Sequence, residues 1–264
     1  MATQKYGGES VWELVLQNQT PIRVLFIQAR RPDDIMIGHE RTCVQKRFSA
    51  VPSNITFHNA YVAPPDRNLL DTHDAIVLGG SGDFSVYHRN SRSWVSPINR
   101  LLEESLKRSI PGFGLCFGHQ LLGQFLGSDV VSSSEHAEIG TTEATLTKAG
   151  EADSLFRTLD RIFPIHTGHS DWVTTVPEGV DILASNDKLT TQAMRVRGTN
   201  FFSTQFHPDM TGQEAQERYD AYRDVFHKCH KPENDDAKKL FKAGADQSTQ
   251  LLGVFAQYVS DLIS

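Results

Sequence analysis

The chain has 264 residues, of which 39% are hydrophobic and 22% charged; this composition is typical of a globular protein with one large domain or two small ones. Its formal net charge of −6 provides no basic excess to neutralise phosphates, which argues against nucleic acid and anionic membranes as partners. The three cysteines are too widely spaced for a disulfide framework, no signal-peptide apolar run opens the chain, and 18 uninterrupted apolar residues occur nowhere. We therefore expect a cytoplasmic protein without a membrane span.

The first part of the chain has the pattern of strands alternating with helices. Residues 1–21 form a polar lead-in, and apolar or alternating runs predict strands at 22–27, 54–62 and 75–78. The apolar spacing between 94 and 109 predicts an amphipathic helix. Such a succession indicates a parallel sheet with right-handed crossovers.

A glycine-rich segment, Gly79-Gly80-Ser81-Gly82-Asp83, follows the third predicted strand. Such a turn can cradle the phosphates of a dinucleotide, but this one lacks the third glycine of that fingerprint. Two interpretations remain: a tight structural turn, or a loop that exposes backbone N–H groups to a developing negative charge. In a parallel sheet the segment would lie at the carboxyl edge, where open α/β sheets place their ligands.

Residues 111–127 are the segment around which the rest of the chain is organised. A short apolar run reaches Cys116, with Gly114 two residues before it and Gly118 two residues after it, and a segment with helical apolar spacing begins there. This is the pattern of a nucleophile elbow, a strained strand-to-helix turn whose flanking positions have no room for side chains. A helix N-terminus also favours a thiolate. The alternative is a buried structural cysteine.

Beyond residue 130 the pattern changes to shorter alternating runs, which predict a more antiparallel half. These runs span 142–147, 171–176, 181–184, 191–196 and 201–206. The remaining residues are polar, with amphipathic stretches near 214–228 and 237–262 that predict a helical C-terminal lobe.

A cysteine nucleophile needs a base, and the base needs an orienting group. His207 follows a predicted buried strand, and Asp209 lies two residues on, close enough to fold back and hold the tautomer of the ring. An exposed His-Pro turn is the alternative interpretation. His169 with Asp171 is a rival pair of the same form, whereas His119 is expected on the flank of the helix after the elbow.

Histidines and glutamates do not combine into a metal site. His136 with Glu138, or His166 with His169, would supply two ligands each, and no third and fourth ligand stands at a suitable spacing.

The resemblance of this chain to a known family is specific because four motifs match in order and spacing. They are Gly79-Gly80-Ser81-Gly82-Asp83, Gly114-Leu115-Cys116-Phe117-Gly118-His119-Gln120, His169-Ser170-Asp171 and Gln205-Phe206-His207-Pro208-Asp209. Together they resemble the class I (triad) glutamine amidotransferase family, in particular stand-alone members similar to the glutaminase domain of GMP synthase. The resemblance covers about residues 22–210 and implies an α/β, flavodoxin-like fold: an open, mostly parallel sheet flanked by helices. We expect that domain at 22–210, with an antiparallel extension, and a helical extension at 211–264 packed on it.

The resemblance implies a role for each residue of the triad. Cys116 is the expected nucleophile, His207 the base and acid, and Asp209 the residue that orients His207. The reaction would be acyl transfer from the side-chain amide of glutamine through a γ-glutamyl thioester, releasing ammonia and glutamate. No metal or organic cofactor is needed for it.

The same resemblance implies the binding groups. The backbone N–H groups of Gly80 and Phe117 would form the oxyanion hole, and Gln120 would help to hold the amino-acid end of the substrate. The His169 segment would lie near the mouth of the site, which makes His169 a weaker candidate for the base.

Two departures from the family pattern leave alternatives open. The family usually has Glu where this chain has Asp209, one methylene shorter, so the contact with His207 is expected to be looser or to be reached by a shifted backbone. Residues 211–264 are too few for a synthetase domain, so either the ammonia passes to a separate synthetase subunit or the protein is itself a hydrolase. A γ-glutamyl peptidase with the same Cys-His-Asp chemistry is one alternative, and a non-catalytic regulatory or binding protein is another.

Overall fold

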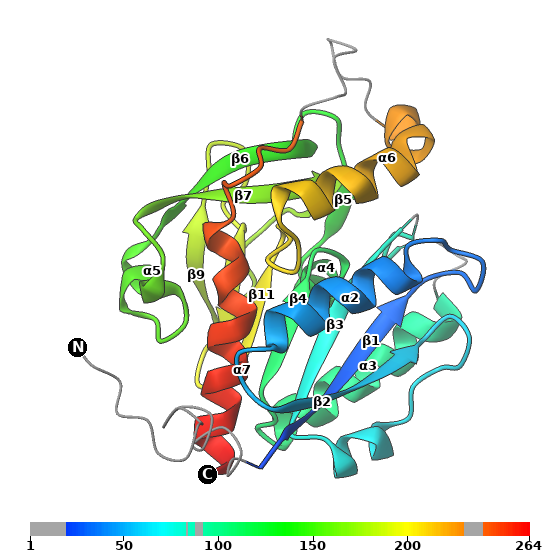
Figure 1. The fold of residues 1–264 in the computed structure, drawn as a ribbon, viewed down its shortest axis with the longest axis vertical. Coiled ribbons are helices and arrows are strands. Elements are labelled where there is room, and N and C mark those ends of the chain that lie inside the picture. The colour runs from blue at the N-terminus through cyan, green and yellow to red at the C-terminus, as the bar shows by residue number, and fades with distance from the viewer. Residues whose placement is uncertain (1–19, 83, 88–91, 230–239) are drawn as a thin grey trace, which may run out of the picture.

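A nine-stranded sheet in the order β2-β1-β3-β4-β11-β10-β9-β6-β7 runs through the protein (Figure 1). The computed structural model describes residues 20–82, 84–87, 92–229 and 240–264. Most of the predicted lead-in and Asp83 of the glycine-rich segment lie outside the described residues. The predicted α/β fold with a mostly parallel central sheet and an antiparallel extension is confirmed.

Five adjacent strands run parallel. They are β2 (Ser53–Asn59), β1 (Ile22–Ala29), β3 (Ala75–Ser81), β4 (Gly112–Leu115) and β11 (Phe201–Thr204). On β1, Val24 and Phe26 belong to one hydrophobic cluster and Leu25 and Ile27 to another. Because neighbouring side chains of a strand point to opposite faces, both faces of this half of the sheet are covered.

The boundaries of β2 and β3 differ from prediction in ways that bear on the site. β2 ends at Asn59 and not at 62, because the backbone turns back there, with the N–H groups of Val62 and Ala63 donating to the Asn59 carbonyl. β3 continues through Ser81, where that residue pairs with Ala29 of β1. Gly79 and Gly80 are therefore strand residues and not a turn.

The prediction that 201–206 belongs to the antiparallel half was wrong. β11 lies beside β4 in parallel, with Thr204 opposite Leu115, and is antiparallel only to β10 on its other side. Alternation with a period of two is the same in both kinds of sheet, so it could not distinguish them. This placement brings the chain after β11 to the same edge as the chain after β4.

The antiparallel extension continues the sheet past β11. It consists of β10 (Ala193–Val196), β9 (Val180–Ser185), β6 (Glu138–Leu146) and β7 (Ile162–His169). The sequence pattern did not indicate β7, whose apolar alternation is interrupted by Pro164. The run at 171–176 forms only the short β8 (Asp171–Val173), which pairs with β5 (Val130–Ser132) in a separate two-stranded sheet.

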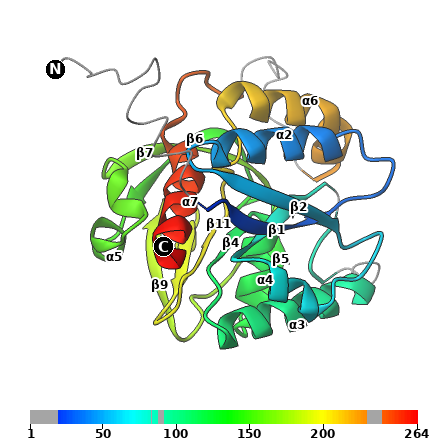
Figure 2. The ribbon, with the colours of Figure 1, turned by 60° about the horizontal axis from the view of Figure 1, so that its bottom comes forward.

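Helices cover both faces of the sheet (Figure 2). On one face lie α2 (Ile37–Phe48) and α7 (Gln250–Ile263), and on the other lie α3 (Arg92–Lys107) and α4 (Phe117–Phe125). The short elements are η1 (Arg67–Thr72), α5 (Lys148–Ala152), η3 (Phe156–Thr158) and η5 (Gln247–Thr249). No helix in the described part of the chain is long and apolar enough to cross a membrane.

The helix predicted near 214–228 is α6 (Gly212–Cys229), which lies beside α2. The second predicted helix, 237–262, is shorter than expected: residues 237–239 lie outside the described residues, and α7 begins only at 250. The segment before it pairs with β6, since the N–H of Thr141 donates to the Leu240 carbonyl at 2.9 Å. Because α7 packs on α2 and β1, we propose that 211–264 forms one domain with 22–210.

Candidate active site

Cys116 occupies a strained turn between β4 and α4. Its backbone has φ 48° and ψ −94°, which places a residue with a side chain in the left-handed region that favours glycine. A Cβ atom added to Gly114 would lie 2.8 Å from the backbone of Gly118, and one added to Gly118 would collide with the carbonyl oxygen of Leu78. Both flanking glycines are therefore required by close backbone packing, as the elbow pattern predicts.

The parallel pairing of β4 with β11 brings the motif at residues 205–209 close to Cys116. The N–H of Cys116 donates to the Thr204 carbonyl at 2.8 Å, which continues the ladder by one residue. The side-chain amide of Gln205 then lies 3.6 Å from the Cys116 sulfur, within donor distance. His207 follows two residues later, and its N–H donates to the His166 carbonyl at 2.9 Å, so its backbone is anchored on β7.

The His207 ring lies between Asp209 and Cys116. Its Nδ1 is 3.0 Å from Asp209 Oδ1, so the shorter Asp209 reaches the ring without the looser contact that was expected. Burial by itself lowers the pKa of His207, but the negative charges of Asp209 and the Cys116 sulfur outweigh it and raise that pKa to about 9. The arrangement therefore favours a positively charged His207 ring over a neutral one.

Asp209 is a buried carboxylate with partners on both oxygens. Its Oδ2 lies 3.3 Å from Nη2 of Arg218 on α6, and both side chains are almost fully buried. Burial by itself raises the pKa of the Asp209 carboxyl, yet the positive charges of Arg218 and His207 hold that pKa well below its usual range. Asp209 thus stays ionised beside the ring.

Of the predicted oxyanion-hole residues, Gly80 lies against His207 and Phe117 directly follows Cys116. A Cβ atom on Gly80 would lie 3.1 Å from Cε1 of His207, so the end of β3 runs against the ring. Phe117 begins α4 directly after the nucleophile, and its ring packs on Trp94 at 5.5 Å between centroids. The N-terminal N–H groups of a helix are free to bind an anion.

Gln120 is held close to the site by hydrogen bonds within the protein. Its side-chain amide donates to the Asp171 carbonyl at 2.9 Å and to the Gln205 side-chain oxygen at 3.4 Å. It therefore joins the elbow helix to the His169-Ser170-Asp171 segment. A direct hold on substrate by Gln120 stays a prediction.

The rival histidines have other partners. Nε2 of His169 lies 3.4 Å from the buried Glu138 carboxylate, and Nδ1 of His119 lies 2.9 Å from Ser203 Oγ. Burial, with a smaller contribution from His169, lowers the pKa of His119 to about 3, so that ring is neutral. In the described part of the chain, no three His, Cys, Asp or Glu residues are grouped to hold a metal ion.

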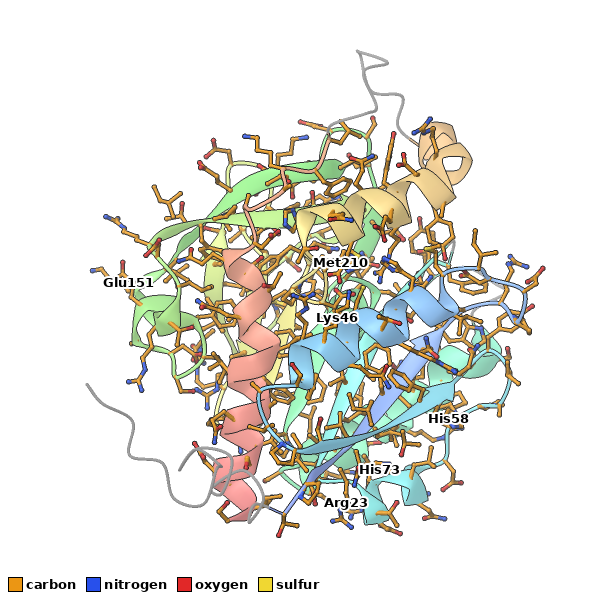
Figure 3. The ribbon with its side chains drawn as sticks, viewed as in Figure 1. Arg23, Lys46, His58, His73, Glu151 and Met210 are labelled. Carbon is orange, nitrogen blue, oxygen red and sulfur yellow. The ribbon has the colours of Figure 1, made fainter. Side chains whose placement is uncertain are left out.

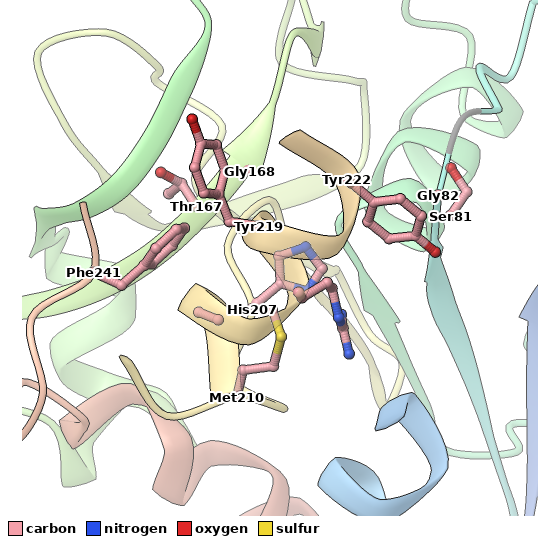
Figure 4. A pocket seen from close by; sticks show the side chains of 11 residues that line it. Ser81, Gly82, Thr167, Gly168, His207, Met210, Tyr219, Tyr222 and Phe241 are labelled. Atoms are coloured by element: carbon pink, nitrogen blue, oxygen red, sulfur yellow. The ribbon is translucent and has the colours of Figure 1, made fainter. Parts of the chain in front are cut away.

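A cavity of about 30 Å³ adjoins His207 (Figure 4). Its lining joins the ends of β3 and β7 to α6 and the segment before α7: Ser81, Gly82, Thr167, Gly168, His207, Met210, Ala215, Arg218, Tyr219, Tyr222 and Phe241. The sequence pattern gave no indication that α6 takes part, because its arginines and tyrosines look like those of an ordinary amphipathic helix. Figure 3 shows Lys46 and Met210 where α2 and α6 face each other.

The charge state of His207 can be measured. In protein with ¹³C-labelled histidine, the His207 ring signal, assigned with His207→Asn, is expected to titrate near pH 9 and to remain protonated at pH 7.5. Replacing Cys116 by alanine removes one of the two negative charges that favour the imidazolium, so the His207 pKa is expected to fall. A titration near pH 6 in the parent protein would contradict the arrangement.

Comparison with known proteins identifies a family whose model matches this chain. Residues 40–224 match the family model described as glutamine amidotransferase class-I. A glutamine-hydrolyzing GMP synthase subunit from Sulfurisphaera tokodaii is 27% identical over 178 residues, 66% of this chain and 87% of that protein. A glutamine amidotransferase structure from Thermotoga maritima superposes with a TM-score of 0.67 at 20% identity, covering 92% of this chain and 97% of that one. A glutamine amidotransferase structure from Methylobacillus flagellatus, at 18% identity, has a TM-score of 0.63 and covers 92% and 93% of the two chains.

Proposed function

Because this chain belongs to the class I glutamine amidotransferase family, whose model matches residues 40–224, we propose that it hydrolyses the side-chain amide of glutamine. The proposal rests above all on one observation: Cys116 stands in a strained elbow beside a buried His207 that is paired with Asp209. A structural cysteine needs neither the strain nor the charged ring.

In the first step the Cys116 thiolate attacks the side-chain carbonyl carbon of glutamine. The electron pair of the C=O bond moves to oxygen, and the backbone N–H groups of Gly80 and Phe117 stabilise the oxyanion. Loss of one such donor typically costs about 10²–10³ in rate. His207, already protonated, then gives its proton to the departing nitrogen, and ammonia leaves.

In the second step water hydrolyses the γ-glutamyl thioester. His207, now neutral, takes a proton from the water as it attacks, and returns it to the Cys116 sulfur or keeps it as the imidazolium. Asp209 holds the ring in one tautomer through both steps by its 3.0 Å contact with Nδ1. Glutamate is released, and no cofactor is needed for either step.

We place glutamine before γ-glutamyl peptides as substrate, because the similar proteins from Sulfurisphaera tokodaii and Sulfolobus acidocaldarius are named as glutamine-hydrolyzing.

The ammonia acceptor is proposed to lie on another chain. The similar proteins from Sulfurisphaera tokodaii and Sulfolobus acidocaldarius are named as glutamine-hydrolyzing GMP synthase subunits. By analogy, we propose that a separate synthetase subunit receives the ammonia from this protein.

Steady-state kinetics tests the proposal. The purified protein is expected to release ammonia and glutamate in equal amounts from L-glutamine, and to turn over γ-glutamyl dipeptides at least tenfold less efficiently. Preferred turnover of the dipeptides would transfer the protein to the peptidase alternative. No turnover of either, with Cys116 also unreactive toward a glutamine-like electrophile, would support a non-catalytic role.

A further inference from the structure

The two oxygens of the Asp209 carboxylate have different partners. Oδ1 contacts Nδ1 of His207 at 3.0 Å, and Oδ2 contacts Nη2 of Arg218 at 3.3 Å. A carboxylate with one partner can rotate about its Cβ–Cγ bond, whereas one with a partner on each oxygen is fixed in a plane. The rotation that presents Oδ1 to the ring is therefore set from α6.

The buried charges of Asp209 and Arg218 also indicate that Arg218 controls the state of Asp209. The exposed fractions are 1% for the Asp209 side chain and 8% for that of Arg218, so water does little to stabilise either charge. The charge of Arg218 is the largest single contribution that lowers the pKa of Asp209, ahead of the charge of His207 and of its hydrogen bond. A buried anion that lost this cation would be compensated by the imidazolium alone.

Arg218 is itself held in place because α6 is fixed at both sides. Glu214 accepts from Lys46 and Arg47 of α2, each at 2.8 Å. One turn beyond Arg218, the Tyr222 hydroxyl donates to Asp34 at 2.6 Å, in the loop after β1.

The side chains of α2 that face Arg218 are not carboxylates. From α2, His39 Nδ1 lies 3.4 Å from Nη2 of Arg218 and Cys43 lies nearby. Burial first, and then the charge of Arg218, lowers the pKa of His39. Among the contacts of the described residues, Asp209 is the carboxylate within ion-pair distance of Arg218.

We propose that Arg218 is a positioning residue of the active centre: it holds Asp209 against His207, so that α6 completes the Cys116–His207–Asp209 group. The proposal builds on the glutaminase function proposed above. It explains how the chain works with Asp209 in place of the longer glutamate, because the short carboxylate is supported from behind by a guanidinium.

The test is a double-mutant cycle between positions 218 and 209. Arg218→Met is expected to lower kcat for glutamine about 10- to 100-fold with KM changed less than threefold, since a displaced catalytic group can cost about 10² in rate. Arg218→Lys keeps the charge and is expected to recover part of the loss. In an Asp209→Asn background, Arg218→Met is expected to cost less than threefold more, because its partner charge is already absent.

Arg223→Met is the matched control on the same helix, since Arg223 pairs with the half-exposed Asp220. It is expected to leave kcat unchanged. Full additivity of the 218 and 209 substitutions, or an equal loss in Arg223→Met, would overturn the proposal. If Arg218→Met does not fold, as judged by circular dichroism, the same cycle with Arg218→Lys decides.

A second readout separates this inference from the function it builds on. The rate at which iodoacetamide alkylates Cys116, followed by mass spectrometry, depends on the His207 imidazolium but needs no turnover. Arg218→Met is expected to slow it by the factor seen in kcat. A wild-type protein that alkylates but hydrolyses no glutamine would refute the proposed function, whereas alkylation unchanged by Arg218→Met would refute the inference.

Discussion

Replacing Cys116 by serine is expected to lower glutamine turnover by about 10⁴-fold or more, since removing the nucleophile of a catalytic triad costs up to about 10⁶ in kcat. The loss is expected in kcat, because the elbow and the binding groups are unchanged. Ammonia release, measured with a coupled dehydrogenase assay, gives the rate. The fold is expected to persist, because serine accepts the same backbone conformation and adds no volume at a side chain that is 7% exposed.

Cys43→Ser is the control for this substitution. Cys43 is also a buried free cysteine, and burial raises the pKa of its thiol to about 12, so the thiol stays neutral and unreactive. The Cys43→Ser variant is therefore expected to retain glutamine turnover. Activity that survives in Cys116→Ser but disappears in Cys43→Ser would assign the nucleophile to α2 and reject the elbow.

Replacing His207 by glutamine is expected to lower kcat by about 10⁴-fold, because one ring stabilises the thiolate and moves the proton in both steps. The effect is expected to extend to Cys116 itself: its alkylation at pH 7.5 is expected to slow, since the neighbouring positive charge is lost. Stopped-time alkylation with peptide mapping and the ammonia assay measure the two effects on one preparation.

His73→Gln is the matched control. His73 precedes β3 at the amino edge of the parallel strands, the edge opposite the elbow (Figure 3). It is expected to leave both rates unchanged. A His207→Gln variant with normal alkylation and turnover would show that another histidine acts as the acid and base, with His169 the first to test.

The elbow was predictable because its residue pattern and the contact between its two glycines are local, although Gly118 also packs against Leu78 of β3. Gly114, Cys116 and Gly118 lie within five residues, and the close approach of Gly114 to Gly118 arises inside the turn itself. The His207–Asp209 contact is local in the same way, at a separation of two residues. Short-range sterics limit what such segments can do, so their residue types can be read without knowing the rest of the fold.

The meeting of the two segments was not predictable from residue patterns. It depends on β11 lying parallel to β4, and alternation along 201–206 is equally consistent with the antiparallel neighbour that was expected. The four motifs in register implied the meeting only through the family resemblance. The physical reason is that strand direction is set by the connection between the two strands, which spans residues 116–200 here.

Residue types alone specified the chemistry of each segment: a thiol at a helix N-terminus, an imidazole next to a carboxylate, and glycines after a buried apolar run. Tertiary structure alone decided which of these groups face one another and what surrounds them. Arg218 illustrates the difference, because a helical arginine in a charged segment is ordinarily solvated. It becomes a buried partner of Asp209 only when α6 packs on α2 and excludes water, and burial and proximity are properties of the packed chain.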